Sequence, residues 1–333
     1  MRNVTRSVPV RHRPRFTFDR ALSVGGGGDK RASADVIKQL TGAGMNEQTL
    51  TMIAGLGDVI ARCDGVLCDV WGVLHDGVHV FAAAGAALAT ARNAGVPVVL
   101  ITNSPRLAPQ IAQQLAEIGV SRAAWDAIVT SGDATRALFG SYAPGPALKI
   151  GPHAEEGPIF DDLGLRFTKD IGAASFIALT DLDYRVGERP DDYHAILRQA
   201  LARDLPLVCG NPDIQVRIGD QLYWCAGALA RDYAQWGGRV QMAGKPFAPI
   251  YDLALAKLAA IKGRELARSR VLAIGDGPAT DIAGANQNGL MSLYCLSGIS
   301  EQAKGASVDH GAVAASLAAY GARADFALPH LRW

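Results

Sequence analysis

The sequence predicts an α/β protein, built on a doubly wound parallel sheet into which a second α/β domain is inserted. Short, continuous apolar runs alternate with helical stretches early in the chain and again late, which is typical of parallel strands covered on both faces. The stretch between these two halves has strands and a helix of its own. With 333 residues, of which 49% are hydrophobic and 20% charged, the chain is long enough for two domains.

The early half begins with the apolar run of residues 65–74, which we interpret as a buried strand. An alanine-rich helix at 82–94 follows, then a strand at 96–101, a helix at 110–118 and a strand at 127–130. Each of these helices is followed by glycine, the usual residue just beyond a helix C-terminus. The pattern predicts a βαβαβ unit.

The late half has the same alternation in five further elements: a strand at 240–243, a helix at 250–261, a strand at 270–274, a helix at 281–288 and a strand at 291–296. The middle segment has expected strands near 147–150, 176–179 and 205–209 and a helix at 190–202. We therefore expect residues 46–143 and 225–333 to form the sheet domain, and residues 144–224 to form an inserted α/β cap.

Residues 1–45 differ from the rest, because arginines recur along them and four consecutive glycines occupy positions 25–28. Such a composition buries little apolar surface, so we expect a disordered basic extension. An organelle transit peptide, a basic tail for an acidic partner, and translation from a start codon placed upstream of Met45 are the alternatives.

Global properties exclude several classes of partner. The formal net charge of +1 gives no indication of nucleic acid or an anionic membrane as a partner. Apolar runs stay below the ~18 residues of a membrane span, and no secretory signal is recognisable. The five cysteines form no C-x-x-C pair, so we expect reduced, mostly buried thiols in a cytoplasmic protein. A homodimer is compatible with the sequence, which does not specify an oligomeric state.

Polar side chains gather where four predicted strands end. Asp69 lies late in the first strand, the segment Thr102-Asn103-Ser104 ends the second, Lys245 follows a third and Asp276 ends a fourth. One such residue alone is usually a helix cap or a loop residue. Because sites in open parallel sheets form outside the carboxyl ends of the strands, four in this order predict a single site.

The chemistry that fits this set is phosphoryl transfer. A carboxylate that attacks a phosphate dianion needs a divalent cation and a lysine beside it, because like charges repel. We expect Asp69 to be the nucleophile and a Mg²⁺ ligand, with Asp276 as a second ligand. Lys245 would hold Asp69 and the phosphate oxygens as a point charge.

The remaining polar residues complete the expected site. The Thr102 hydroxyl and the Asn103 backbone N–H, with Ser104 beside them, would bind the equatorial phosphate oxygens. Asp281 follows Asp276 by five residues, at the start of a predicted helix. It either orients the metal shell from behind or caps the helix.

Four motifs resemble motifs I to IV of the haloacid dehalogenase (HAD) superfamily: Asp69-Val-Trp-Gly-Val, Ile101-Thr-Asn-Ser, Gly244-Lys-Pro and Gly275-Asp-Gly-Pro-Ala-Thr-Asp. The segments Gly210-Asn-Pro-Asp213 and Cys225-Ala-Gly-Ala-Leu229 resemble those of class IIA, NagD-type phosphatases. The sequence of motif I resembles that of one subgroup of this class. The resemblance implies a Rossmann-like HAD core with a large cap between motifs II and III. It makes Asn211 and Asp213 a candidate specificity loop, although Asn-Pro-Asp alone indicates only a turn.

One residue departs from the family pattern. The resemblance implies a second motif I aspartate that protonates the leaving group, but Trp71 stands there. Its backbone carbonyl can still be a Mg²⁺ ligand, as in the family, whereas its indole N–H only donates. A positioned acid or base is worth about 10²–10⁴ in rate. His75 and Asp76 are candidate substitutes, although Asp76-Gly77 alone indicates only a turn.

We therefore expect a Mg²⁺-dependent phosphatase of a small phosphorylated metabolite, acting through an aspartyl phosphate on Asp69, with activity weakened by Trp71. A HAD enzyme of another reaction class is the first alternative, either phosphoryl transfer or dehalogenation, because a departing halide needs no proton. The second alternative is a non-catalytic protein that binds a phosphometabolite.

Overall fold

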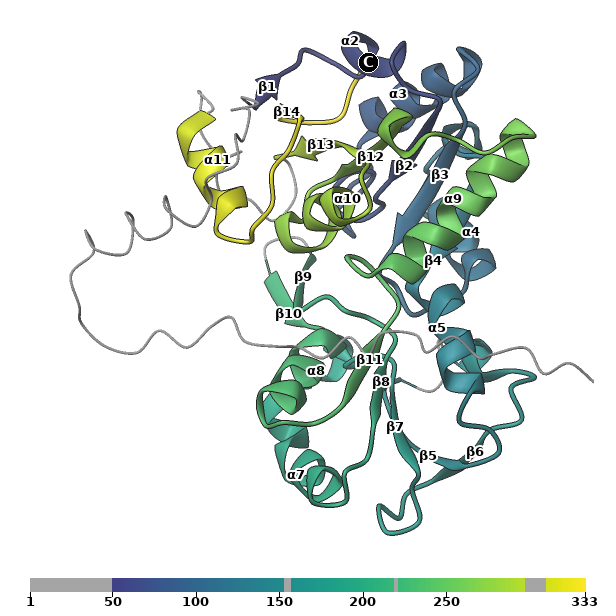
Figure 1. Ribbon diagram of the computed structural model, residues 1–333, viewed down its shortest axis with the longest axis vertical. Coiled ribbons are helices and arrows are strands. Elements are labelled where there is room, and N and C mark those ends of the chain that lie inside the picture. Colours follow the sequence, from purple (N-terminus) through teal and green to yellow (C-terminus); the bar gives the residue numbers. More distant parts are fainter. Residues whose placement is uncertain (1–49, 153–156, 219–220, 297–309) are drawn as a thin grey trace, which may run out of the picture. The chain divides into compact units, whose positions relative to one another are not determined.

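The computed structural model describes residues 50–152, 157–218, 221–296 and 310–333 (Figure 1). The extension expected at residues 1–45 therefore lies outside the described residues. The described residues all belong to the unit Gln48–Trp333. None of the helices in these ranges is long and apolar enough to cross a membrane.

A seven-stranded sheet forms the larger part of the fold, in the order β1-β14-β13-β12-β2-β3-β4, and every neighbouring pair is parallel. Its strands are β1 (Thr51–Met52), β2 (Gly65–Cys68), β3 (Val98–Thr102), β4 (Ala127–Thr130), β12 (Val271–Gly275), β13 (Met291–Cys295) and β14 (Phe326–Leu328). Strand β2 is central and fully buried, with β12 and β3 as its neighbours. The predicted parallel sheet is confirmed.

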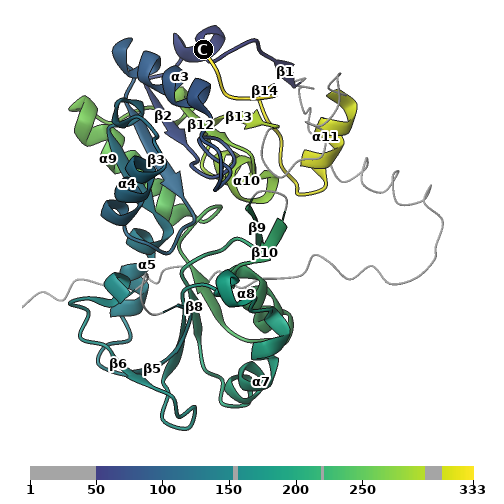
Figure 2. The same cartoon turned by 180° about the vertical axis from the view of Figure 1, so that it is seen from behind.

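Helices cover both faces of this sheet, as Figures 1 and 2 show from opposite sides. They are α2 (Gly57–Ile60), α3 (Ala82–Asn93), α4 (Ala108–Glu117), α5 (Ser131–Gly140), α9 (Ala248–Lys262), α10 (Ala283–Gln287) and α11 (His310–Ala318). Side chains alternate between the faces along a strand. Val66 and Cys68 pack with Leu88 of α3 and Leu115 of α4, whereas Leu67 packs with α9 and α10. The unbroken apolar run of β2 follows from this two-sided burial.

A second sheet has five parallel strands in the order β11-β8-β7-β5-β6. Its strands are β5 (Pro146–Ile150), β6 (Arg166–Thr168), β7 (Phe176–Leu179), β8 (Leu207–Cys209) and β11 (Val240–Met242). Helices α7 (His194–Ala202) and α8 (Ala226–Gln235) belong with it, and the antiparallel pair β9 (Gln215–Ile218) and β10 (Gln221–Trp224) lies between β8 and α8 in the chain.

The second sheet continues beyond residue 224, where the sequence led us to end the cap. Strand β11 pairs with β8 in the register Val240 to Leu207, and α8 contributes Leu229 and Tyr233 to the same apolar cluster as Leu207. The expected boundary is therefore too early, and Val240–Met242 is not a strand of the large sheet. Strand pairing joins residues distant in sequence, so the local pattern did not reveal it.

Candidate active site

Asp69 stands immediately after β2, at the carboxyl end of the large sheet. The strand ends at Cys68 rather than at residue 74 as expected, and the Asp69 N–H donates to the Ile274 carbonyl of β12 at 2.8 Å. The chain then turns sharply at Gly72, which has a φ of +78°. A Cβ at this position would lie 2.2 Å from Oδ2 of Asp276, so glycine lets the turn pack against that carboxylate.

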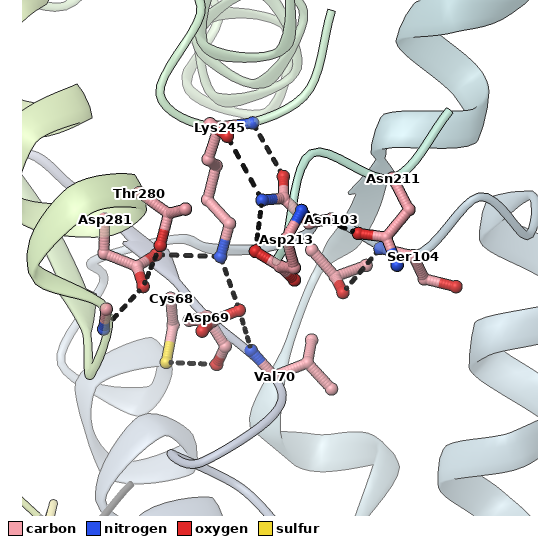
Figure 3. A network of polar contacts seen from close by, with 12 residues as sticks. Cys68, Asp69, Val70, Asn103, Ser104, Asn211, Asp213, Lys245, Thr280 and Asp281 are labelled. Carbon is pink, nitrogen blue, oxygen red and sulfur yellow. Dashed lines mark hydrogen bonds and ion pairs between the residues drawn. The ribbon is translucent and has the colours of Figure 1, made fainter. Parts of the chain in front are cut away.

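Lys245 is the cation at the centre of the site. Its Nζ lies 2.6 Å from Oδ1 of Asp69 and 2.8 Å from Oδ1 of Asp281, and its side chain is only 3% exposed (Figure 3). The backbone of Lys245 is clamped by the Asn103 amide, which accepts from the Lys245 N–H at 2.7 Å and donates to the Lys245 carbonyl at 3.1 Å. Motifs that are distant in sequence thus meet at one point.

Three buried carboxylates cluster at this point, and two of them contact the ammonium group. Asp69, Asp276 and Asp281 offer oxygen atoms that all lie within 4.8 Å of one another. Asp281 also accepts from the Gly277 N–H at 3.0 Å, which orients it toward Lys245. The sequence left open whether Asp281 caps a helix or supports the site, and its contact with Lys245 gives it a place in the site.

Electrostatics make this cluster a strong site for a cation. Burial, and then the neighbouring Asp281, raise the pKa of Asp69 well above its usual range. The pKa of Lys245 is raised as well, because Asp281 and Asp69 outweigh the opposing effect of burial. Three carboxylates exceed one ammonium in charge, and a cluster of carboxylate oxygens fits a hard divalent cation such as Mg²⁺.

A pocket of about 230 Å³ opens beside this centre, lined by residues at the end of β3, by segments that follow strands of the second sheet, and by β9 and β10. Thr102 and Ser104, which follow β3, form part of its wall, and the Thr102 hydroxyl accepts from the Ser104 N–H at 3.3 Å. Arg106 also lines the pocket and was not among the predicted residues, although its position two residues after Ser104 was a usable signal. The size of the pocket suits a small metabolite.

The loop between β8 and β9 forms the opposite wall. Asn211 donates to Oδ2 of Asp181 at 2.8 Å and accepts from the Asp213 N–H at 3.0 Å, so its side chain holds the loop in shape. Asp213 accepts from the Asn103 amide at 2.8 Å. The two predicted residues of this loop therefore have different positions. Asp213 contacts Asn103 beside Lys245, whereas Asn211 holds the loop that carries Asp213.

Comparison with known proteins agrees with this geometry. Residues 66–164 match the family described as haloacid dehalogenase-like hydrolase, and residues 242–320 match the family described as HAD-hydrolase-like. A crystal structure of a haloacid dehalogenase-like hydrolase from Brucella suis 1330 is 40% identical, with a TM-score of 0.75, and the alignment covers 84% of this chain and 100% of that one. The chain belongs to the haloacid dehalogenase-like hydrolases.

Two further structures are similar to this chain in fold. NagD from E. coli K-12 is 25% identical with a TM-score of 0.57, over 80% of this chain and 96% of its own. A possible sugar phosphatase of the HAD superfamily from Cytophaga hutchinsonii shares the fold at 18% identity, with a TM-score of 0.67, over 84% of this chain and 98% of its own. The expected class IIA resemblance is confirmed. No curated protein matches the chain in sequence.

In this HAD-like hydrolase, Trp71 serves as a contact between the two parts of the site. Its indole N–H donates to the Arg217 carbonyl of β9 at 2.8 Å, and its ring lies edge-on to His75 with centroids 4.8 Å apart. His75 is 2% exposed, and burial lowers its pKa to about 4, so it is neutral at pH 7. Its Nδ1 accepts from the Gly77 N–H at 3.0 Å.

Asp76, the other candidate substitute for the missing aspartate, forms a turn. Its carboxylate accepts from the N–H groups of Val78 at 2.9 Å and His79 at 2.6 Å, and these bonds lower its pKa against the effect of its slight burial. It does not line the pocket.

All five cysteines are free and buried, as expected.

Proposed function

We propose that this HAD-like hydrolase is a Mg²⁺-dependent phosphatase of a small phosphorylated metabolite, acting through an aspartyl phosphate on Asp69. The observation that carries this proposal is the contact of 2.6 Å between the Lys245 ammonium and the Asp69 carboxylate, with two further buried carboxylates beside them. A pocket of about 230 Å³ adjoins this centre. The resemblance in fold to a possible sugar phosphatase is in keeping with this reaction.

The roles of the residues follow from their charges and contacts. Lys245 offsets the repulsion between the Asp69 carboxylate and an incoming phosphate dianion, and Asp281 holds Lys245 in position. The Thr102 hydroxyl and the Asn103 backbone N–H donate hydrogen bonds to the equatorial phosphate oxygens, with Ser104 beside them.

Asp69, Asp276 and the Trp71 carbonyl are the proposed ligands of Mg²⁺, which when bound neutralises phosphate charge and orients the phosphate. Asn211 shapes the pocket wall on the side of the second sheet. Carbon–halogen cleavage would tolerate Trp71, but three buried carboxylates around one lysine favour a cation-held phosphate as the substrate group.

Phosphate release from a panel of phosphorylated metabolites, measured with Mg²⁺ and with EDTA, tests this proposal. We expect release that depends on Mg²⁺ and falls by about 10³-fold or more in Asp69→Asn, because the nucleophile is lost. Asp252→Asn is the matched control, since that carboxylate is 61% exposed and pairs only at the surface with Arg268. Equal activity of Asp69→Asn and the wild type would overturn the proposal.

A further inference from the structure

We propose that Asp213 is the general acid and base of the reaction at Asp69, in place of the carboxylate that Trp71 replaces in motif I. This inference rests on the proposed phosphatase function. It concerns a different step, the movement of protons to the leaving group and from water, and so it can fail separately.

The groups near Trp71 do not supply this proton. The indole N–H of Trp71 is committed to the Arg217 carbonyl and does not ionise at neutral pH. His75 accepts the Gly77 N–H on Nδ1, so its neutral ring carries a proton only on Nε2, and a neutral imidazole is a very weak acid. Asp76 is held in its own turn. The acid must therefore come from another wall of the pocket.

Asp213 is the carboxyl group that reaches the reaction centre from the opposite wall. Its Oδ1 accepts at 2.8 Å from the Asn103 amide nitrogen, and the same nitrogen donates to the Lys245 carbonyl at 3.1 Å (Figure 3). Asp213 is thus held by Asn103, which also bonds the backbone of Lys245, the residue that contacts Asp69. It lines the pocket together with Thr102 and Trp71.

The second oxygen of Asp213 is available for chemistry. Among the described residues, the Asn103 amide is the only hydrogen-bond donor to this carboxyl group, and it uses Oδ1. Asp181, which also lines the pocket, differs in this respect. Its Oδ1 accepts from the N–H groups of Leu182 and Ala226, and its Oδ2 accepts from Asn211. Asp181 is therefore a positioning residue, which acts on Asp213 through Asn211.

The surroundings of Asp213 suit a group that both gives and takes a proton. Burial raises its pKa above the usual range of an aspartate, against the opposing effects of Lys245 and Asn103, and Asp281 raises it further. Asp181 faces it from the second sheet through the shared Asn211. A raised pKa brings the carboxyl closer to the pH at which acid and base catalysis are both efficient.

The proposed reaction has two steps. In the first, a bond forms between Asp69 oxygen and phosphorus, the bond from phosphorus to the leaving oxygen breaks, and Asp213 gives its proton to that oxygen. In the second, a water oxygen bonds to phosphorus, the bond from phosphorus to Asp69 breaks, and the Asp213 carboxylate takes the proton of the water. Both residues then return to their starting states.

Asp213→Asn tests this role, because asparagine has nearly the same shape and can still accept from Asn103. We expect kcat for alkyl phosphates to fall by about 10²–10⁴. With p-nitrophenyl phosphate the first step should be far less affected, because nitrophenolate departs without a proton, and nitrophenol should appear as a burst followed by slow turnover. Asp204→Asn is the control, since its carboxylate is 77% exposed and pairs with Arg239 on the surface.

Asp213→Glu separates the loss of an acid from a loss of structure. It retains a carboxyl group, and we expect it to recover part of the alkyl-phosphate turnover that Asp213→Asn lacks. Equal losses with alkyl and aryl substrates and no burst, or alkyl-phosphate turnover as fast in Asp213→Asn as in the wild type, would overturn the inference alone. A wild type without phosphatase activity would overturn the proposed function and this inference with it.

Discussion

Removal of the Lys245 charge by Lys245→Met should destabilise the folded chain when no divalent cation is bound. In the wild type, the ammonium contacts Asp69 at 2.6 Å and Asp281 at 2.8 Å, and the Lys245 side chain is 3% exposed. Methionine nearly matches the shape of the aliphatic part of lysine. The substitution therefore removes the charge and leaves Asp69, Asp276 and Asp281 without it.

The size of the effect follows from the distances. At an effective dielectric constant of about 20, each lost contact is worth roughly 6 kcal/mol before solvation is counted. Two carboxylate oxygens 4.8 Å apart repel by roughly 3.5 kcal/mol on the same scale. Desolvation of the lysine offsets much of this, and removal of one partner of a buried ion pair costs about 3–5 kcal/mol. We therefore expect the free energy of unfolding to fall by about 3–5 kcal/mol.

Urea unfolding in EDTA measures this loss. The deficit should grow as the pH rises above the ordinary range of an aspartate, because loss of Lys245 removes the charge that lowers the pKa of Asp69 in the fold. A carboxyl whose pKa is raised in the folded state stabilises the fold at low pH and loses that contribution as the pH rises. Asp281→Asn added to Lys245→Met should recover at least about 1 kcal/mol, since one repelling charge is removed. Lys262→Met is the matched control, because that partly exposed lysine donates to the Gly95 carbonyl at the surface. A Lys245→Met variant as stable as the control would refute the reasoning.

Three further predictions concern other parts of the chain. Trp71→Phe removes the hydrogen bond to the Arg217 carbonyl, which is worth about 1 kcal/mol, so backbone hydrogen exchange in β9 and β10 should accelerate by about fivefold. Unchanged exchange would show that this bond does not hold β9 in place. Because burial lowers the pKa of His75 to about 4 in the folded state, the free energy of unfolding should fall by about 3 kcal/mol as the pH drops from 6.5 to 4. Urea unfolding at several pH values measures this loss, and the loss should be smaller in His75→Asn. Deletion of residues 1–45 should leave the thermal midpoint within about 5 °C of the full chain, and a larger fall would show that they pack on the core.

Much of the fold and of the site could be predicted from local patterns. The central strands of the large sheet are unbroken apolar runs, because both of their faces are covered, and their ends mark Asp69, Thr102 and Asp276. Topology then dictates that such ends share one edge of the sheet. The meeting of the three carboxylates follows from this rule without any knowledge of side-chain contacts.

Features that depend on pairing across the chain escaped the sequence. Strand β11 precedes Lys245 and resembles a strand of the large sheet, but its partner β8 assigns it to the second sheet. Trp71 bonds a carbonyl 146 residues away, and Asn103 bonds Asp213 across 110 residues. No local periodicity records such contacts. The departure at Trp71 was visible, whereas its role as a contact and the approach of Asp213 required the three-dimensional structure.

Trapping of the phosphorylated enzyme tests the central claim most directly. An acyl phosphate on Asp69 is reduced by borohydride to an alcohol, so quenching during turnover should convert residue 69 to homoserine, which peptide mass spectrometry detects. We expect this product at position 69 only when Mg²⁺ and a phosphorylated substrate are both present. Its yield should be greater in Asp213→Asn, where breakdown of the intermediate is slow. Steady turnover with no reduced residue at position 69, or with reduction at another carboxylate, would contradict it.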